Sequence, residues 1–202
     1  MAHEGLWAQV DKLDLQETAK RAGCRHLSEP ERCVLTMLNT QYEVNLGDRR
    51  ISVVQDDSSS KSAGFMEQLC ILAYLLGAKD IPPAEKLVKA ESLPGGQFLF
   101  RGPHSLPTGK LAKAFGDDPE GLIRASRQFD VEKCDFGDGS IRVNVLPRVP
   151  LTFVIWRGDD EFEARASILF DQTAGTHLAL DALLAAVNLT VKKLLEVGGT
   201  SG

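Results

Sequence analysis

The clearest pattern of apolar and polar positions lies near the end of the chain, between residues 146 and 195. Residues 151–156, Leu-Thr-Phe-Val-Ile-Trp, are almost continuously apolar, β-branched or aromatic, which predicts a strand covered on both faces. A turn rich in carboxylates follows, and residues 166–170 return as a second buried strand. After a loop over residues 171–177, apolar residues recur every three or four positions up to Leu195 and predict a long amphipathic helix. We expect this hairpin and helix to form the centre of the core.

Shorter elements are expected around this centre. Strands are predicted over residues 33–38, 41–46, 50–54, 97–100 and 141–145, and helices over residues 7–13, 14–22, 65–76, 110–115 and 119–129. Asp14 and Glu17 have the spacing of a capping box at the start of the second helix. The pattern predicts a single α+β domain over residues 1–197, with an N-terminal helical arm, a largely antiparallel sheet with packed helices and a long C-terminal helix, followed by a flexible tail over residues 198–202.

Composition narrows the classes of partner. The 202 residues carry a net charge of −5, which argues against broad binding to nucleic-acid phosphates. The longest apolar run, residues 69–76, is far too short to span a bilayer, and the N-terminus lacks the basic start and apolar core of a secretory signal. We therefore expect a cytoplasmic protein with no nucleic-acid or membrane partner, whose cysteines are reduced.

Three other stretches carry possible chemistry. The four cysteines, Cys24, Cys33, Cys70 and Cys134, contain no Cys-x-x-Cys pair, so we predict that they hold no metal ion. Residues 102–110 fail the phosphate-loop pattern, because its first glycine and the Ser or Thr after the lysine are both missing. The carboxylates within residues 159–163 could bind a hard cation, although a solvated hairpin turn is the preferred interpretation.

Asp171 and His177 flank the last loop, between a buried strand and a helix start, where polar groups can converge on a ligand. His177 could act as a general base or as an axial metal ligand, with Asp171 orienting its imidazole. Trp156, immediately before the acidic turn, is a further candidate ligand contact. In the alternative interpretation, Asp171 hydrogen-bonds the turn backbone and His177 lies on the surface. No residue pattern identifies a cofactor.

Several segments together resemble a known family, namely residues 93–96 (Leu-Pro-Gly-Gly), 111–116, 146–156, 158–162 and 168–171. From about Leu13 to Leu195 the chain resembles the domain-of-unknown-function family number three-seven-eight-six, which is found largely in anaerobic bacteria and archaea. Some relatives carry a four-cysteine iron–sulfur module similar to that of corrinoid iron–sulfur proteins. The resemblance thus implies proximity to corrinoid or one-carbon metabolism, but this chain lacks the cysteine module, so the redox part of the inference does not transfer.

Three functional hypotheses remain open at this point. The first is an accessory protein that binds a small ligand or cofactor, conceivably a corrinoid, in anaerobic metabolism. The second is an enzyme of unknown reaction that uses the region of Asp171 and His177. The third is a protein-interaction subunit without small-molecule chemistry. A pocket that joins Trp156, Asp171 and His177 would favour the first two, and a large exposed apolar patch the third.

Overall fold

The structure is a computed structural model that describes residues 3–54 and 61–198. The flexible tail was predicted to begin at Gly198, but Gly198 is the last residue of the final helix. Residues 199–202 of that tail, and most of the serine-rich stretch between residues 55 and 62, lie outside the described residues.

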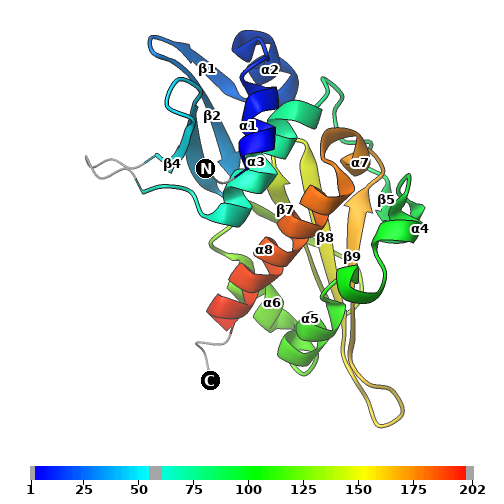
Figure 1. Cartoon of the computed structure of the whole chain (residues 1–202). Helices are drawn as coiled ribbons and strands as arrows, with labels where there is room; N and C mark the ends of the chain where they lie inside the picture. The colour runs from blue at the N-terminus through cyan, green and yellow to red at the C-terminus, as the bar shows by residue number, and fades with distance from the viewer. Residues whose placement is uncertain (1–2, 55–60, 199–202) are drawn as a thin grey trace.

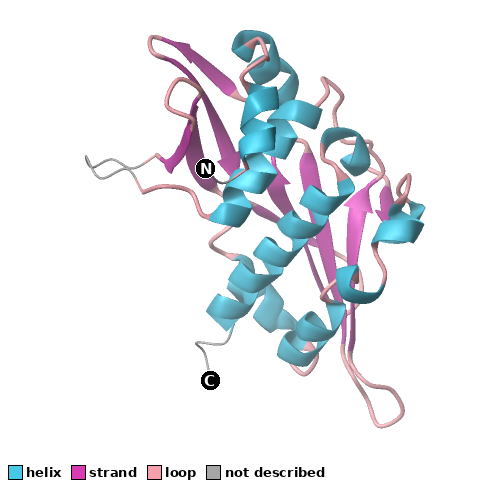
Figure 2. Ribbon diagram, viewed as in Figure 1, coloured by secondary structure: helices cyan, strands magenta, loops and turns pink. Residues whose placement is uncertain are grey.

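The chain forms an α+β fold with two antiparallel sheets (Figures 1 and 2). The first sheet is a four-stranded meander in the order β1-β2-β3-β4, with β1 Arg25–Ser28, β2 Glu31–Met37, β3 Thr40–Asn45 and β4 Arg50–Val53. The second has the order β5-β9-β8-β7-β6, with β5 Leu87–Lys89, β6 Val131–Cys134, β7 Gly139–Leu146, β8 Val149–Trp156 and β9 Arg165–Asp171. The predicted meander and the predicted central hairpin therefore belong to separate sheets.

The second sheet is built around β8, as the sequence predicts. Every residue of β8 from Val149 to Ile155 is buried, and the strand pairs with β7 on one side and with β9 on the other. A continuous apolar run of this kind is typical of a strand covered on both faces. The short outer strands β5 and β6 complete the sheet; neither is predicted from the sequence, and both are only partly buried.

Helices gather on one side of the sheets, with α8 lying across the second sheet and α3 packed against α8, α1 and α2 (Figures 1 and 2). Their bounds are α1 Glu4–Val10, α2 Leu15–Ala22, α3 Phe65–Gly77, α4 Gly96–Leu99, α5 Thr108–Phe115, α6 Pro119–Ser126, α7 Ala174–His177 and α8 Leu180–Gly198, with short 3-10 turns at Ala90–Ser92 and Gly102–His104. No helix within residues 3–54 and 61–198 combines the length and apolar character needed to cross a bilayer.

Sequence features at the ends of α2 correctly predict where this helix begins and ends. The Asp14 carboxylate accepts a hydrogen bond from the Glu17 amide at 2.8 Å, which caps α2 as predicted. Gly23 ends that helix in the left-handed conformation, with φ 65°. One prediction is wrong: residues 97–100 were expected to form a strand, but α4 covers most of them. Its Phe98 is 75% exposed, so the apolar residues there do not mark a buried strand.

The two sheets meet where the β2–β3 turn touches the end of β7. Leu38 and Asn39 form this two-residue turn and both have positive φ, as in the primed turns that suit hairpin twist. A register irregularity between Asn144 and Leu146 interrupts the β7–β8 ladder, and the Val145 carbonyl there accepts the Leu38 amide at 3.0 Å. The Leu38 side chain is buried, so the hairpin end joins one continuous core shared by both sheets.

Candidate functional site

Asp171 is the last residue of β9, and its side chain accepts hydrogen bonds from the backbone around it. Its carboxylate accepts the Ala84 amide at 2.9 Å, the Thr173 amide at 2.9 Å and the Thr173 hydroxyl at 2.6 Å. Burial acts to raise the pKa of Asp171, but these hydrogen bonds to the charged form outweigh it, and the net shift is downward. Asp171 therefore holds the turn backbone as an ionised group, which agrees with the second of the two sequence interpretations.

His177 is the clearest correction to the sequence interpretation. A surface position was expected, but the side chain is fully buried, against the end of α3. Its Nδ1 accepts the Lys79 amide at 3.3 Å, while Nε2 is buried without a hydrogen-bond partner. The expected hydrogen bond from the imidazole N–H to the Asp171 carboxylate does not form between these two described residues. His177 thus has the setting of a packed, neutral histidine.

Trp156 lies at the other end of the β8–β9 hairpin. It pairs with Arg165, whose guanidinium carbon lies 4.8 Å from the centre of the indole ring, whereas Asp171 follows Phe170, the partner of Leu151. Five or six residues of strand separate the two ends, roughly 17–20 Å. The structure therefore does not bring Trp156, Asp171 and His177 into one pocket.

The acidic turn after Trp156 forms its own hydrogen bonds. The Asp159 carboxylate accepts the amides of Glu161 at 2.9 Å and Phe162 at 2.8 Å, as a turn-forming aspartate does. Across residues 3–54 and 61–198, no three His, Cys, Asp or Glu side chains gather closely enough to hold a metal ion. The turn also lies at the end of the hairpin opposite Asp171, so the two do not form a common site.

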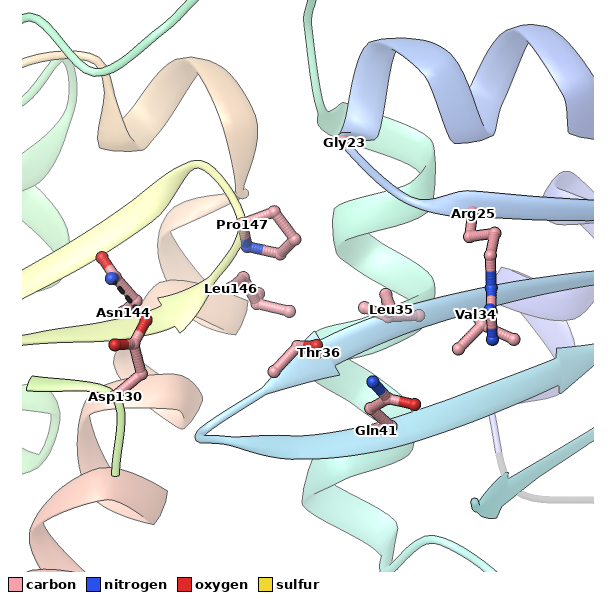
Figure 3. Close-up of a pocket in the computed structure, with 10 residues that line it drawn as sticks. All are labelled: Gly23, Arg25, Val34, Leu35, Thr36, Gln41, Asp130, Asn144, Leu146 and Pro147. Atoms are coloured by element: carbon pink, nitrogen blue, oxygen red, sulfur yellow. Dashed lines mark hydrogen bonds between the residues drawn. The ribbon is translucent and has the colours of Figure 1, made fainter. Parts of the chain in front are cut away.

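A cleft of about 520 Å³ lies where the two sheets meet, on the strand faces that look away from the core. It is larger than the pocket of about 190 Å³ that Asp171 helps to line. We call it the inter-sheet cleft; its lining residues are Gly23, Arg25, Val34, Leu35, Thr36, Gln41, Asp130, Asn144, Leu146 and Pro147. Figure 3 shows the first six on one side of the cleft and the last four on the other.

Strand pairing explains how the polar groups come to one face. Arg25 of β1 is the cross-strand partner of Val34, and Thr36 is the partner of Gln41, so their side chains share the outer face of the first sheet. On that same face, Arg32 and Glu43 form an ion pair at 2.8 Å. Within the described part of the chain, by contrast, the side chains of Arg25, Thr36 and Gln41 have no polar partner.

The opposite wall contributes a carboxylate and an amide. The Asn144 side chain donates to Asp130 Oδ2 at 2.8 Å, and the Asn144 amide donates to the Asp130 carbonyl at 3.2 Å (Figure 3). These two hydrogen bonds hold both side chains at the cleft. They leave Asp130 Oδ1 and the side-chain oxygen of Asn144, Oδ1, available as acceptors. The apolar floor comes from Val34, Leu35 and Leu146, which are all buried.

The arrangement offers one positive and one negative side chain across an apolar floor. A guanidinium recognises carboxylates and phosphates through paired N–H donors, and a carboxylate with a neighbouring amide oxygen accepts hydrogen bonds from hydroxyl or amino groups. No sequence pattern singles out these residues, because they come from two segments, residues 23–41 and 130–147, that are far apart in the sequence. The one available signal is the polar positions of the meander, Thr36 and Gln41, which alternate with core residues.

Comparison with known proteins identifies the family and nothing closer. No curated protein and no solved structure gives a significant match to the chain. A family model described as "Domain of unknown function (DUF3786)" matches residues 14–193. Because that match spans most of the chain and includes both sheets, the protein belongs to the DUF3786 family.

Proposed function

We propose that this protein binds a small polar ligand in the inter-sheet cleft and acts as a cytoplasmic binding or accessory protein. The observation that carries the proposal is a set of polar side chains that have no polar partner among the described residues, Arg25, Thr36 and Gln41, over a buried apolar floor. Pockets that bind small molecules combine such a floor with a few polar groups, typically in volumes of about 300–1,000 Å³. The cleft volume of about 520 Å³ lies in this range.

The charges of the two walls define the class of ligand. Arg25 is suited to a carboxylate or phosphate group at one end of the ligand. Asp130 and Asn144 are suited to hydroxyl or amino groups at the other end, because both offer an oxygen that accepts hydrogen bonds. The ligand we propose is therefore a small molecule with an anionic group at one end and hydroxyl or amino groups at the other, such as an amino acid, a hydroxy acid or a sugar phosphate.

A thermal-shift screen of the full chain tests this proposal. The panel contains amino acids, hydroxy acids and sugar phosphates, together with uncharged polyols and aliphatic diamines that lack the anionic group. A ligand at 100 times its Kd stabilises the folded state by about 2.7 kcal/mol, which is readily detected as a rise in melting temperature. We expect a rise only with compounds that carry the anionic group. A rise only with the polyols or diamines, or none at all, would contradict the proposal.

The link to corrinoid or one-carbon metabolism rests on the family resemblance and is a separate part of the proposal. His177 is not part of this proposal, because its imidazole is fully buried. The direct test is the absorption spectrum of hydroxocobalamin with and without the protein under anaerobic conditions. A spectral change that saturates with protein supports the link, and an unchanged spectrum with no co-elution in gel filtration removes it.

A further inference from the structure

Part of β9 lacks a partner strand on the side of β5. The ladder between these two strands ends where Lys89 lies opposite Leu169, and the chain then leaves the sheet in the 3-10 turn Ala90–Ser92. Figure 1 shows the short β5 beside only one end of β9. Residues 165–168 of β9 therefore pair with β8 on one side and, within the described chain, form an open sheet edge on the other.

The hydrogen-bond pattern determines which backbone groups face this open edge. The Lys86 carbonyl accepts the Gln172 amide at 2.9 Å, so Gln172 directs its backbone groups toward the β5 side. Because alternate residues of an antiparallel strand bond to the same side, Ile168 and Ala166 also face the open edge. Among the described residues, none accepts a hydrogen bond from the Ile168 N–H, and none pairs with the N–H or carbonyl of Ala166.

The Ile168 amide is a donor that needs a partner. Ile168 is only 3% exposed, so its backbone has little access to water. A buried N–H without a hydrogen-bond partner lowers stability, and nearly all such groups in proteins are paired. The same residue lines a cleft of about 320 Å³, which we call the edge cleft, together with Ser167 and Leu169 beside it on β9. A ligand in the edge cleft can therefore reach the unpaired donor.

We propose that the edge cleft binds an extended peptide segment of a partner protein, which continues the line of β5 and pairs with the open edge of β9. One peptide carbonyl accepts the Ile168 N–H, and the residue two positions further along the peptide exchanges hydrogen bonds with Ala166. The hydroxyls of Ser105 and Thr108 also line the cleft and have no hydrogen-bond partner within the described chain. They can bond the peptide groups that point away from β9.

The core side of the sheet sets one side chain of the peptide. Cross-strand partners share a face, so the peptide residue opposite Ile168 points to the same side as Ile168 and Phe170. Phe100 lines the edge cleft, and its ring centre lies 5.9 Å from that of Phe170. Leu106 also lines the cleft and packs against the core. We therefore expect an apolar side chain opposite Ile168.

The outer side of the sheet sets the next side chain, opposite Ser167. Arg165 lies two positions before Ser167, and Lys89 is the partner of Leu169 two positions after it, so both cations share the face of Ser167. Both are exposed, and neither forms an ion pair with another described residue. Among the described residues, Glu91 is the one carboxylate that lines the cleft. Two cations against one carboxylate favour an acidic side chain at this position of the peptide.

The test titrates the isotope-labelled full chain with the blocked peptide acetyl-Thr-Val-Glu-Ala-Thr-amide and follows backbone amides by NMR. Its valine takes the place opposite Ile168, and its alanine the place opposite Ala166. We expect shifts of both protein amide signals and slower hydrogen exchange of the Ile168 N–H. Methylation of the peptide alanine nitrogen removes the donor to the Ala166 carbonyl and should weaken binding by at least tenfold, about 1.4 kcal/mol. Methylation of the glutamate nitrogen, which points away from β9, should weaken binding less.

Charge reversal tests the acidic position separately. Lys89→Glu should weaken binding of this peptide and strengthen binding of a matched peptide that carries lysine in place of glutamate. Lys20→Glu makes the same change at an exposed position of α2 outside the cleft and should bind both peptides like the wild type. Both variants should melt like the wild type, because neither side chain is buried. Wild-type binding of both peptides by Lys89→Glu would contradict the acidic position.

Three results would overturn the proposal. The first is unchanged Ile168 and Ala166 amide signals at every peptide concentration. The second is equal binding of the unmodified peptide and the peptide methylated at its alanine nitrogen, which would show that the peptide backbone does not pair with β9. The third is an Ile168 amide already protected from exchange in peptide-free protein that sediments as a dimer, which would show that a second copy of the chain covers the edge.

Discussion

At the scale of single residues, His177 shows how burial sets the charge of a titratable group. Removal from water lowers the pKa of its imidazole, the nearby Arg148 lowers it further, and Asp171 opposes them. Because Nδ1 accepts the Lys79 amide, the proton of the neutral ring resides on Nε2, which has no partner. The ring is thus neutral at pH 7 and sits in a site that does not accept a second proton easily.

This setting predicts a dependence of stability on acidity. The unfolded chain takes up a proton on His177 near its ordinary pKa of about 6.5, whereas the folded chain resists protonation until a lower pH. The free energy of unfolding should therefore fall as the pH falls from 7.5 to 5.5, by at most about 1.4 kcal/mol per pH unit from this group. His177→Asn keeps an acceptor near the position of Nδ1 and cannot titrate, so urea denaturation should give it a smaller pH dependence. Equal dependence in both proteins would contradict this account.

Asp171 also makes the free energy of unfolding fall as the pH falls, but in a lower pH range than His177. Its folded pKa is lowered, so the stability that it contributes is present above the ordinary carboxyl pKa and is lost as the pH falls through the folded value. Asp171→Asn removes the charge that strengthens the three hydrogen bonds, and we expect a loss of about 1–3 kcal/mol at pH 7. In denaturant titrations this difference from the wild type should shrink toward pH 3. A difference that grows at low pH would show that the carboxylate is not stabilised in the folded state.

At the scale of elements, the regular and well-buried segments are those that the sequence predicts. The β8 run, the two strands beside it, α3 and α8 all bury most of the apolar residues that define their pattern. The strands that the sequence did not predict, β1, β5 and β6, have three or four residues each, none of them buried, so they carry too few core-facing apolar positions to show a period. Tertiary pairing, rather than local pattern, makes them strands.

The central position of β8 makes one substitution decisive. Val154 is 1% exposed, and Val154→Asp would place an unpaired carboxylate in the core, at a cost of at least about 3 kcal/mol. Phe162→Asp is the matched control, since it adds the same charge in the turn of the same hairpin, where the side chain is 69% exposed. Thermal unfolding should show a large loss for the first variant and a change of about 0.5 kcal/mol or less for the second. Similar unfolding curves for the two variants would contradict the placement of β8 in the core.

At the scale of the whole molecule, the candidate site depends on contacts that no local pattern contains. The inter-sheet cleft requires the β2–β3 turn to dock on β7 through the Leu38 and Val145 backbone bond. That contact joins segments more than one hundred residues apart and depends on an irregularity in β7. The sequence could place Asp171 and His177 near each other because only six positions separate them, but it could not reveal that one holds a turn and the other is buried.

The distribution of exposed apolar residues bears on the hypothesis of a protein-interaction subunit. The most exposed aromatic side chains among the described residues are Phe98, Phe162 and Phe65, which lie on α4, in the β8–β9 turn and at the start of α3. Figure 1 places these three elements on different sides of the molecule. They do not form the single contiguous patch that a stable protein interface typically has.

The most direct test of the account is the affinity of the inter-sheet cleft for the anionic compound that gives the largest thermal shift. Calorimetric titration of this compound should show that Arg25→Gln weakens binding by at least tenfold, about 1.4 kcal/mol, because a charge-assisted hydrogen bond is lost. Arg25 is exposed and has no partner among the described residues, so the variant should melt like the wild type. Arg101→Gln changes an exposed arginine outside the cleft and should leave the affinity unchanged. Wild-type affinity in Arg25→Gln, or an equal loss in Arg101→Gln, would contradict binding in the cleft.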